Sequence, residues 1–464
     1  MTREVIGLVV LDLIFVIVGQ AMLAGLGVIR SSAECGRFLG LALVCGWAVT
    51  GCSLSIVLAL GAPFRWYVAA AAWGSTLAVS AAGLSRCRRS SWAPLLEERP
   101  IGRWAARCAA ALLVLYVLLL VVRSARFDGG FHPDVWSFWL PKAKIIYLFH
   151  GLAAGDGGMT SQGSPDYPPF DPILDALSFG AMGRADVLLL PVQHVVIAAG
   201  FLGSAAALLG RKVRPALLYP SLAALALMPG WSRLAGSCLA DESLALCLAT
   251  AALLGALWLL EPRSWLLALC SLFLVAAALD KNEGLMLGVS LVVGLAVASR
   301  RITAILALLS PVVVAVVVWR IWLHAHHVPP NAAYDLSHVL HPGYLADHLS
   351  RLGYGSRKLL SDLAAPREWL ALTPLALVAA WSAGRAGARV STLLLGTLLL
   401  GLSGFAVIYW TSPLELHYYV DNSVSRVVSS LALVAAVLFP LLLAQAGALD
   451  RLLGSAGDGG SRAL

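Results

Sequence analysis

Four short polar segments interrupt an otherwise apolar sequence, and the first has the residue types for proton transfer and phosphate binding. It covers 127–147 and contains Asp128 and Asp134, followed by Lys142 and Lys144. A carboxylate can accept the proton of a hydroxyl nucleophile, and nearby ammonium groups can offset the charge of a phosphate. Two prolines within the segment predict a pair of short helices lying on the membrane. The alternative is a surface-anchoring helix with solvated charges.

A proline-rich turn at 165–170 follows in the same polar region and contains Asp166. It leads into the apolar stretch 171–183, which is too short to cross a bilayer and is expected to lie on the membrane surface. Asp166, Asp171 and Asp175 are candidates for metal or acceptor binding. The alternative is a rigid turn with solvated acids.

The second segment is an acidic pair, Asp241 and Glu242, at the start of the apolar run 240–260. Acids at the end of a membrane span are costly unless they are paired, hydrated or functional. We expect them to position an acceptor or a metal. The alternative is that they satisfy the amides at the N-terminus of their own helix.

The third segment, Lys281, Asn282 and Glu283, forms a tight polar turn between two apolar runs. Lys281 would meet a phosphate, with Glu283 holding the ammonium in place. A self-satisfied ion-pair turn is the alternative.

The fourth segment contains Ser423 and Arg426 and precedes the last apolar run. An arginine at the end of a span suits phosphate binding because its guanidinium can bind two oxygens at once. The alternative is an arginine that reaches out to the lipid headgroups.

The run Asp134-Val-Trp-Ser-Phe-Trp-Leu-Pro-Lys142-Ala-Lys144, with Asp166-Tyr167-Pro-Pro169 after it, resembles the first external loop of bacterial membrane glycosyltransferases of the GT-C superfamily. The Ser423–Arg426 pattern is similar to the corresponding end of these proteins. The resemblance implies a polyprenyl-phosphate sugar as donor and a base role for Asp134, with Asp128 as the neighbouring alternative. It implies supporting roles for Asn282, Glu283, Tyr167 and Ser423.

The composition of the whole chain decides which elements must position these residues. Of 464 residues, 59% are hydrophobic and 12% are charged, against about 25% charged in a soluble domain. We therefore expect an all-α polytopic membrane protein with thirteen spans. They are expected at 5–29, 38–60, 66–84, 105–122, 186–209, 215–228, 240–260, 264–279, 284–299, 302–323, 369–384, 390–410 and 427–446.

The distribution of basic residues predicts which side of the membrane each connection faces. Short connections rich in arginine alternate with two long segments, 123–185 and 324–368. By the positive-inside rule, the arginine-rich side is cytoplasmic and the long segments face outward. This arrangement predicts an external N-terminus and places all four polar segments on the outer face. The net charge of +8 is assigned to membrane orientation and not to nucleic acid.

With the resemblance, these observations predict a multi-pass enzyme of the bacterial plasma (inner) membrane with an outward-facing site. Additional N-terminal helices and a basic cytoplasmic loop (1–104) precede the GT-C-like catalytic module (105–446) and a cytoplasmic tail (447–464). The partners expected are the polyprenyl-phosphate sugar, membrane lipids, and a lipid, glycan or protein acceptor. The sequence identifies no certain cofactor and leaves open a divalent cation, Mg²⁺ or Mn²⁺, held by Asp134 and Asp241. A transporter or flippase and a non-catalytic scaffold are the rival functions.

Overall fold

The computed structural model describes residues 2–84, 100–127, 132–152, 157–331, 336–385 and 388–447. Over these residues the chain is helical and contains no β-strand. Asp128, most of the basic connection expected before residue 104, and almost all of the expected C-terminal tail lie outside the described residues.

Within the described ranges, ten helices are long and apolar enough to cross a membrane. They are α1 (Thr2–Gly25), α3 (Leu39–Ala59), α4 (Trp66–Leu84), α5 (Pro100–Phe127), α8 (Leu190–Leu209), α11 (Ala240–Leu260), α13 (Asn282–Ser299), α14 (Ile302–Ala325), α19 (Arg389–Thr411) and α20 (Leu416–Gln445). The helical architecture is therefore that of a multi-pass membrane protein.

Three of the expected spans correspond to shorter apolar helices. They are α9 (Pro215–Ala226), α12 (Ser264–Asp280) and α18 (Leu372–Gly384), of 12, 17 and 13 residues. A helix needs about 20 residues to cross the hydrocarbon core without distortion. The total of thirteen spans therefore stays a prediction.

Close contact between helix backbones holds the first part of the bundle together. A Cβ atom added to Gly46 of α3 would lie 1.8 Å from the backbone oxygen of Phe15 in α1. A Cβ on Gly19 of α1 would lie 1.8 Å from the oxygen of Ala42 in α3. Small residues let membrane helices approach until their backbones touch, and here glycine is required on both helices.

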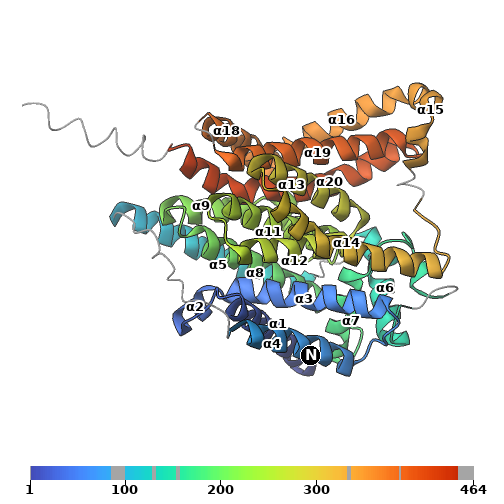
Figure 1. Ribbon diagram of the computed structural model, residues 1–464, viewed down its shortest axis with the longest axis horizontal. Helices are drawn as coiled ribbons and strands as arrows, with labels where there is room; N and C mark the ends of the chain where they lie inside the picture. Colours follow the sequence, from blue (N-terminus) through green and yellow to red (C-terminus); the bar gives the residue numbers. More distant parts are fainter. Residues whose placement is uncertain are drawn as a thin grey trace, which may run out of the picture.

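The centre of the bundle is α11, which is buried along almost its whole length. It packs against α12, α13, α8 and α20. In Figure 1, α11 and α12 lie between the blue N-terminal helices and the red C-terminal ones. The N-terminus of α11, which carries Asp241 and Glu242, is consequently surrounded by protein.

The polar segment after α5 forms a single helical stretch. Pro133 starts it, a π-helical turn η1 (Val135–Trp139) follows, and α6 (Leu140–Phe149) continues without a break. Two separate helices were expected here. The π turn accommodates one extra residue within the helix, a feature that is frequent at functional sites.

The stretch expected on the membrane surface at 171–183 is instead an internal helix, α7 (Phe170–Met182). It packs against α1, α3, α6 and α12, and only 1% of Asp171 and 3% of Asp175 is exposed. The expectation of a surface helix is wrong because both faces of α7 meet protein, including the face that carries the two acids.

The second long segment forms short helices beside α19 and α20. They are η4 (Leu336–Leu340), α15 (Pro342–Asp347), α16 (Leu349–Leu363) and α17 (Pro366–Trp369). The rings of His338, Tyr344 and His348 stack on one another. The remaining short helices of the described part are α2 (Ser32–Arg37), η2 (Met159–Ser161) and α10 (Pro229–Leu234).

Candidate functional site

An arginine in α20 joins two acids that come from distant parts of the chain. Arg426 Nη1 forms an ion pair with Asp134 Oδ2, just before η1. The same nitrogen lies 3.5 Å from Oδ2 of Asp241, the second residue of α11. The Asp241 side chain is 4% exposed, whereas Asp134 and Arg426 keep 27% and 21%. Asp134 therefore remains reachable from outside the bundle.

The network continues through the polar turn between α12 and α13. Lys281 Nζ lies 2.8 Å from Asp241 Oδ1 and 3.4 Å from Glu283 Oε1. The hydroxyl of Tyr167 donates to Glu283 Oε1 at 3.1 Å, and its ring stacks on Trp139. We call Asp134, Arg426, Asp241, Lys281 and Glu283 the ion network.

A glycine sets the shape of the turn that carries Lys281 and Glu283. A Cβ on Gly284 would lie 1.8 Å from the backbone oxygen of Ala277. The start of α13 therefore touches the last turn of α12, and Lys281 between them has an extended backbone. This close approach directs the ammonium of Lys281 toward α11.

Asp166 and Asn282 hold the proline-rich turn against the bundle. Asn282 Nδ2 donates to Asp166 Oδ2 at 2.9 Å. The indole N–H of Trp319, in α14, donates to the backbone oxygen of Asp166 at 3.2 Å. These bonds position the neighbouring Tyr167, so Asp166 and Asn282 support the ion network from outside it.

The two lysines of α6 differ in environment. Lys142 is 1% exposed, and its ammonium donates to the backbone oxygen of Ser164 near the ring of Trp139. Burial lowers the pKa of Lys142 to about 7, although Asp166 opposes this shift. These contacts favour a structural role over the expected phosphate binding. Lys144 is half-buried, with its ammonium 5.9 Å from the ring centroid of Trp136.

Two other expected site residues lie outside the ion network. Glu242 accepts a hydrogen bond from the backbone N–H of Gly236 at 2.9 Å and faces His194. Ser423 hydrogen-bonds to the hydroxyl of Tyr409 at 2.8 Å. Adjacent helical residues point about 100° apart, so Asp241 and Glu242 enter different clusters.

The position between Asp134 and Asp241, where a divalent cation was expected, is occupied by a side chain of the protein. The guanidinium of Arg426 lies between the two carboxylates and contacts both. It supplies positive charge where the metal was expected.

A cavity of about 360 Å³ adjoins the ion network and carries basic side chains that the sequence analysis did not select. Arg123, Arg233 and Arg426 line it together with His132. The other residues that line it are Gly230, Leu234, Ser237, Leu239, Trp369, Asn422, Ser425 and Ser429. We call this cavity the cationic pocket. Two features of the sequence could have identified these arginines: Arg123 directly follows an apolar run, and Arg233 lies in a short connection between two apolar runs.

His132 contributes to this pocket as a mainly neutral group. Burial and the guanidinium of Arg426 hold the pKa of His132 below its usual range, although Asp134 and Asp241 act in the opposite direction. Its Nδ1 accepts a hydrogen bond from the backbone N–H of Asp134 at 3.2 Å. The positive charge of the pocket therefore comes from its arginines, and His132 orients the backbone at Asp134.

An apolar groove of about 170 Å³ is lined in part by Gly284, next in the chain to Glu283. Its walls are aliphatic residues of α12, α13 and α14, including Leu274, Val292 and Val316. Val289 and Val313, which also line it, are about half exposed. The groove therefore opens to the outside of the bundle and suits a hydrocarbon chain.

Comparison of the chain with protein-family models, curated proteins and solved structures finds no match.

Proposed function

We propose that the protein is an integral-membrane glycosyltransferase that moves a sugar from a polyprenyl-phosphate donor to an acceptor hydroxyl, with Asp134 as the general base. The observation that carries the proposal is the contact between Asp134 and Arg426, which are 292 positions apart. A partly exposed carboxylate and a phosphate-binding cation thereby meet at the wall of the cationic pocket.

The reaction is an inverting displacement. Asp134 accepts the proton of the acceptor hydroxyl while its oxygen forms a bond to the anomeric carbon of the sugar. The bond from that carbon to the phosphate oxygen breaks, and polyprenyl phosphate leaves with the electron pair. Arg426 stabilises the negative charge that develops on the leaving phosphate. No strong general acid is required because phosphate leaves as an anion.

The pairing of Arg426 also suggests how a donor frees Asp134 to act as the base. Without substrate, Arg426 is shared between Asp134 and Asp241. A donor phosphate in the cationic pocket competes for the guanidinium, since arginine binds phosphate through two parallel hydrogen bonds. Asp134 then loses its ion-pair partner and can bind the acceptor hydroxyl, while Asp241 keeps Lys281.

The two cavities match the two parts of a lipid-linked substrate. Arg123 adds positive charge around a phosphate in the cationic pocket, and Arg233 can do so when the phosphate competes with its ion-pair partner Glu368. The apolar groove suits the hydrocarbon chain of a lipid substrate. Together with the arginine-rich connections on the opposite side, this favours an outward-facing site in the bacterial plasma membrane and a lipid, glycan or protein as acceptor.

The decisive experiment supplies a panel of radiolabelled polyprenyl-phosphate sugars to proteoliposomes that contain the full chain. We expect one class of donor to yield glycosylated product. In Asp134→Asn, turnover of that donor falls by about 10²–10⁴, the usual contribution of a general base. The matched control is Asp347→Asn, because Asp347 is an exposed acid of α15.

Asp347→Asn is expected to keep wild-type turnover. Membrane-inserted Asp134→Asn protein that makes product at the wild-type rate would refute the base assignment. A folded wild-type chain that uses none of the donors would refute the enzymatic function. A parallel assay with a chelator reports whether a divalent cation contributes.

A transporter or flippase for a polyprenyl-linked lipid or another solute is the second candidate. The observation in its favour is a group of buried ionisable residues around α7 and α8, because such residues mark ion or proton pathways in membrane proteins. Movement of a fluorescent polyprenyl-phosphate lipid across proteoliposomes, without glycosyl transfer, would favour this function.

A further inference from the structure

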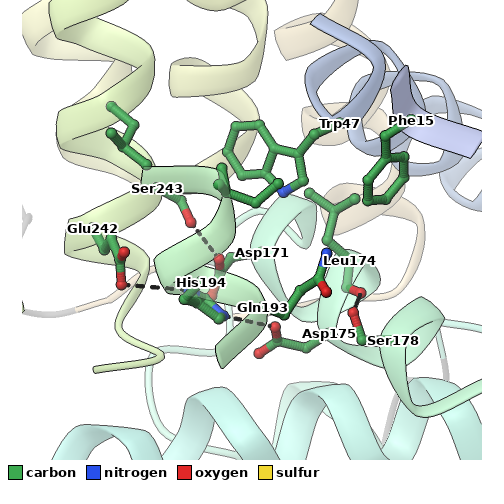
Figure 2. A pocket seen from close by; sticks show the side chains of 12 residues that line it. Phe15, Trp47, Asp171, Leu174, Asp175, Ser178, Gln193, His194, Glu242 and Ser243 are labelled. Carbon is green, nitrogen blue, oxygen red and sulfur yellow. Dashed lines mark hydrogen bonds and ion pairs between the residues drawn. The ribbon is translucent and has the colours of Figure 1, made fainter. Parts of the chain in front are cut away.

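A second polar cluster lies inside the bundle, away from the ion network. His194 of α8 contacts two acids, with Nε2 at 3.0 Å from Asp175 Oδ1 and Nδ1 at 3.5 Å from Glu242 Oε2. Asp171 of α7 accepts a hydrogen bond from the hydroxyl of Ser243 at 2.5 Å. Figure 2 shows these side chains converging from three helices, α7, α8 and α11.

The cluster has more acceptor atoms than donors. Among the residues that the structure describes, four buried oxygens in it accept no hydrogen bond: Asp171 Oδ2, Asp175 Oδ2, Glu242 Oε1 and Gln193 Oε1. Each of these side chains is at most 5% exposed. Burying an acceptor without a donor is unfavourable, and more so when the group is charged. If all three carboxylates are ionised, a single protonated imidazole does not balance their charge.

A small cavity lies among these oxygens. Its volume is about 20 Å³, and Asp171, Asp175, Gln193, His194 and Glu242 line it. A space of about this size holds a single water or ion. One ligand atom from each of Asp171, Asp175 and His194 lies within 4.8 Å of the others. Metal–ligand bonds of about 2.0–2.2 Å place neighbouring ligands roughly 3–4 Å apart, so little movement is needed to enclose a cation.

We propose that this cavity is a divalent metal site, with Asp171, Asp175 and His194 as ligands. Carboxylate oxygens suit Mn²⁺, and imidazole suits Zn²⁺ and other transition metals. A mixed set with one nitrogen and no thiolate therefore points to Mn²⁺ or Zn²⁺. The unpaired oxygen of Gln193 lines the same cavity and can complete the coordination.

The groups around the ligands match those that support metal sites in other proteins. A histidine ligand usually donates its second ring N–H to a carboxylate, and Glu242 faces Nδ1 of His194 at 3.5 Å. Glu242 is in turn held by the backbone N–H of Gly236. Ser243 fixes one oxygen of Asp171 and leaves the other free for the metal.

A cation here would connect the helices around the candidate functional site. The ligands come from α7 and α8, and Glu242, which faces His194, connects the site to α11. Glu242 directly follows Asp241 of the ion network. The metal site does not depend on glycosyl transfer, because a transporter with this structure would also contain it.

The test measures the metal content of the purified full-length chain in detergent. The protein is stripped with a chelator, incubated separately with MnCl₂ and ZnCl₂, passed over a desalting column and analysed by elemental mass spectrometry. We expect close to one bound equivalent of one of the two metals and a higher melting temperature with it. Asp175→Asn and His194→Gln are expected to lose at least nine-tenths of the bound metal.

Three further variants separate metal binding from loss of folding. Glu242→Gln keeps all three ligands, and we expect its affinity to fall by about 10–100-fold, as for other partners of metal ligands. Asp12→Asn is the matched control, because Asp12 hydrogen-bonds to Gln193 from α1 but does not line the cavity. Asp12→Asn is expected to keep the full equivalent of bound metal, and Asp241→Asn is expected to keep it as well.

Less than one-tenth of an equivalent of either metal in folded wild-type protein would overturn the proposal. In that case the acids share protons, and Asp171→Asn would raise the melting temperature in the absence of metal. Equal metal content in the wild type, Asp175→Asn and His194→Gln would also overturn it, since the metal would then be bound elsewhere.

Discussion

Removal of the Arg426 guanidinium tests whether the ion network holds α20 against α11 and η1. Arg426→Met keeps most of the aliphatic volume and leaves Asp134 and Asp241 without their shared cation. At 3.5 Å and an effective dielectric constant of 20, the interaction with Asp241 alone is about 5 kcal/mol before desolvation. Breaking a buried ion pair costs about 3–5 kcal/mol.

The partial exposure of this site lowers the expected effect. Asp134 and Arg426 keep 27% and 21% of their side-chain exposure, so water screens their interaction. We therefore expect Arg426→Met to lower the free energy of unfolding by about 3 kcal/mol and Asp134→Asn by about 1 kcal/mol. The coupling energy between the two changes is expected to be about 1–2 kcal/mol.

The assay is a double-mutant cycle measured by reversible unfolding in mixed micelles with increasing sodium dodecyl sulfate. The control cycle uses Lys358 and Asp421, whose ion pair of 2.8 Å is 42% and 46% exposed. An exposed pair contributes about 0–1 kcal/mol. A coupling for Asp134 and Arg426 below about 0.5 kcal/mol, within the usual additivity error, would refute the network as a structural link.

Three other predictions test different parts of the structure. Lys142 has a pKa of about 7 in the folded protein and about 10.4 when unfolded. Between these pH values the unfolded chain binds more protons than the folded protein, so the free energy of unfolding rises with pH. We expect Lys142→Met to remove about 2 kcal/mol of this rise between pH 7 and pH 9, measured by unfolding at each pH. Gly284→Ala is expected to destabilise the protein by about 1–3 kcal/mol and to lower activity, whereas Gly288→Ala, whose nearest neighbouring atom would lie 3.5 Å away, is tolerated in the same assays. Arg123→Gln and Arg233→Gln each raise the KM for the donor about tenfold if the cationic pocket binds phosphate; unchanged KM values in both variants would remove the pocket from the donor site.

The sequence by itself determined the class of the protein and the places where polar chemistry interrupts it. Long apolar runs predict helices because a membrane leaves the backbone no other way to satisfy its hydrogen bonds locally. The ten long apolar helices confirm the prediction that these runs are helical. The four polar segments stand out because charge is rare in such a chain. The identity of the reaction stays a prediction carried by those segments.

The direction of individual side chains came only from the tertiary structure. Lys142 and Lys144 are two residues apart, yet Lys142 is buried near Trp139 and Lys144 is half-buried near Trp136. Asp241 and Glu242 are adjacent, yet one joins the ion network and the other faces His194. In a helix that is apolar all round, periodicity does not tell which face meets protein and which meets lipid.

The pairing of charges over long distances was likewise decided by the packing of the helices. The sequence predicted that Asp134 and Arg426 belong to one outward-facing site, but not that they form a direct ion pair. It did not predict the contact of His194 with Asp175, because the two residues lie on separate elements. The burial of α7 depends on its contacts with α1 and α12 in the same way. Local residue patterns encode hydrophobicity and helix formation, whereas the meeting of charges is a property of the assembled bundle.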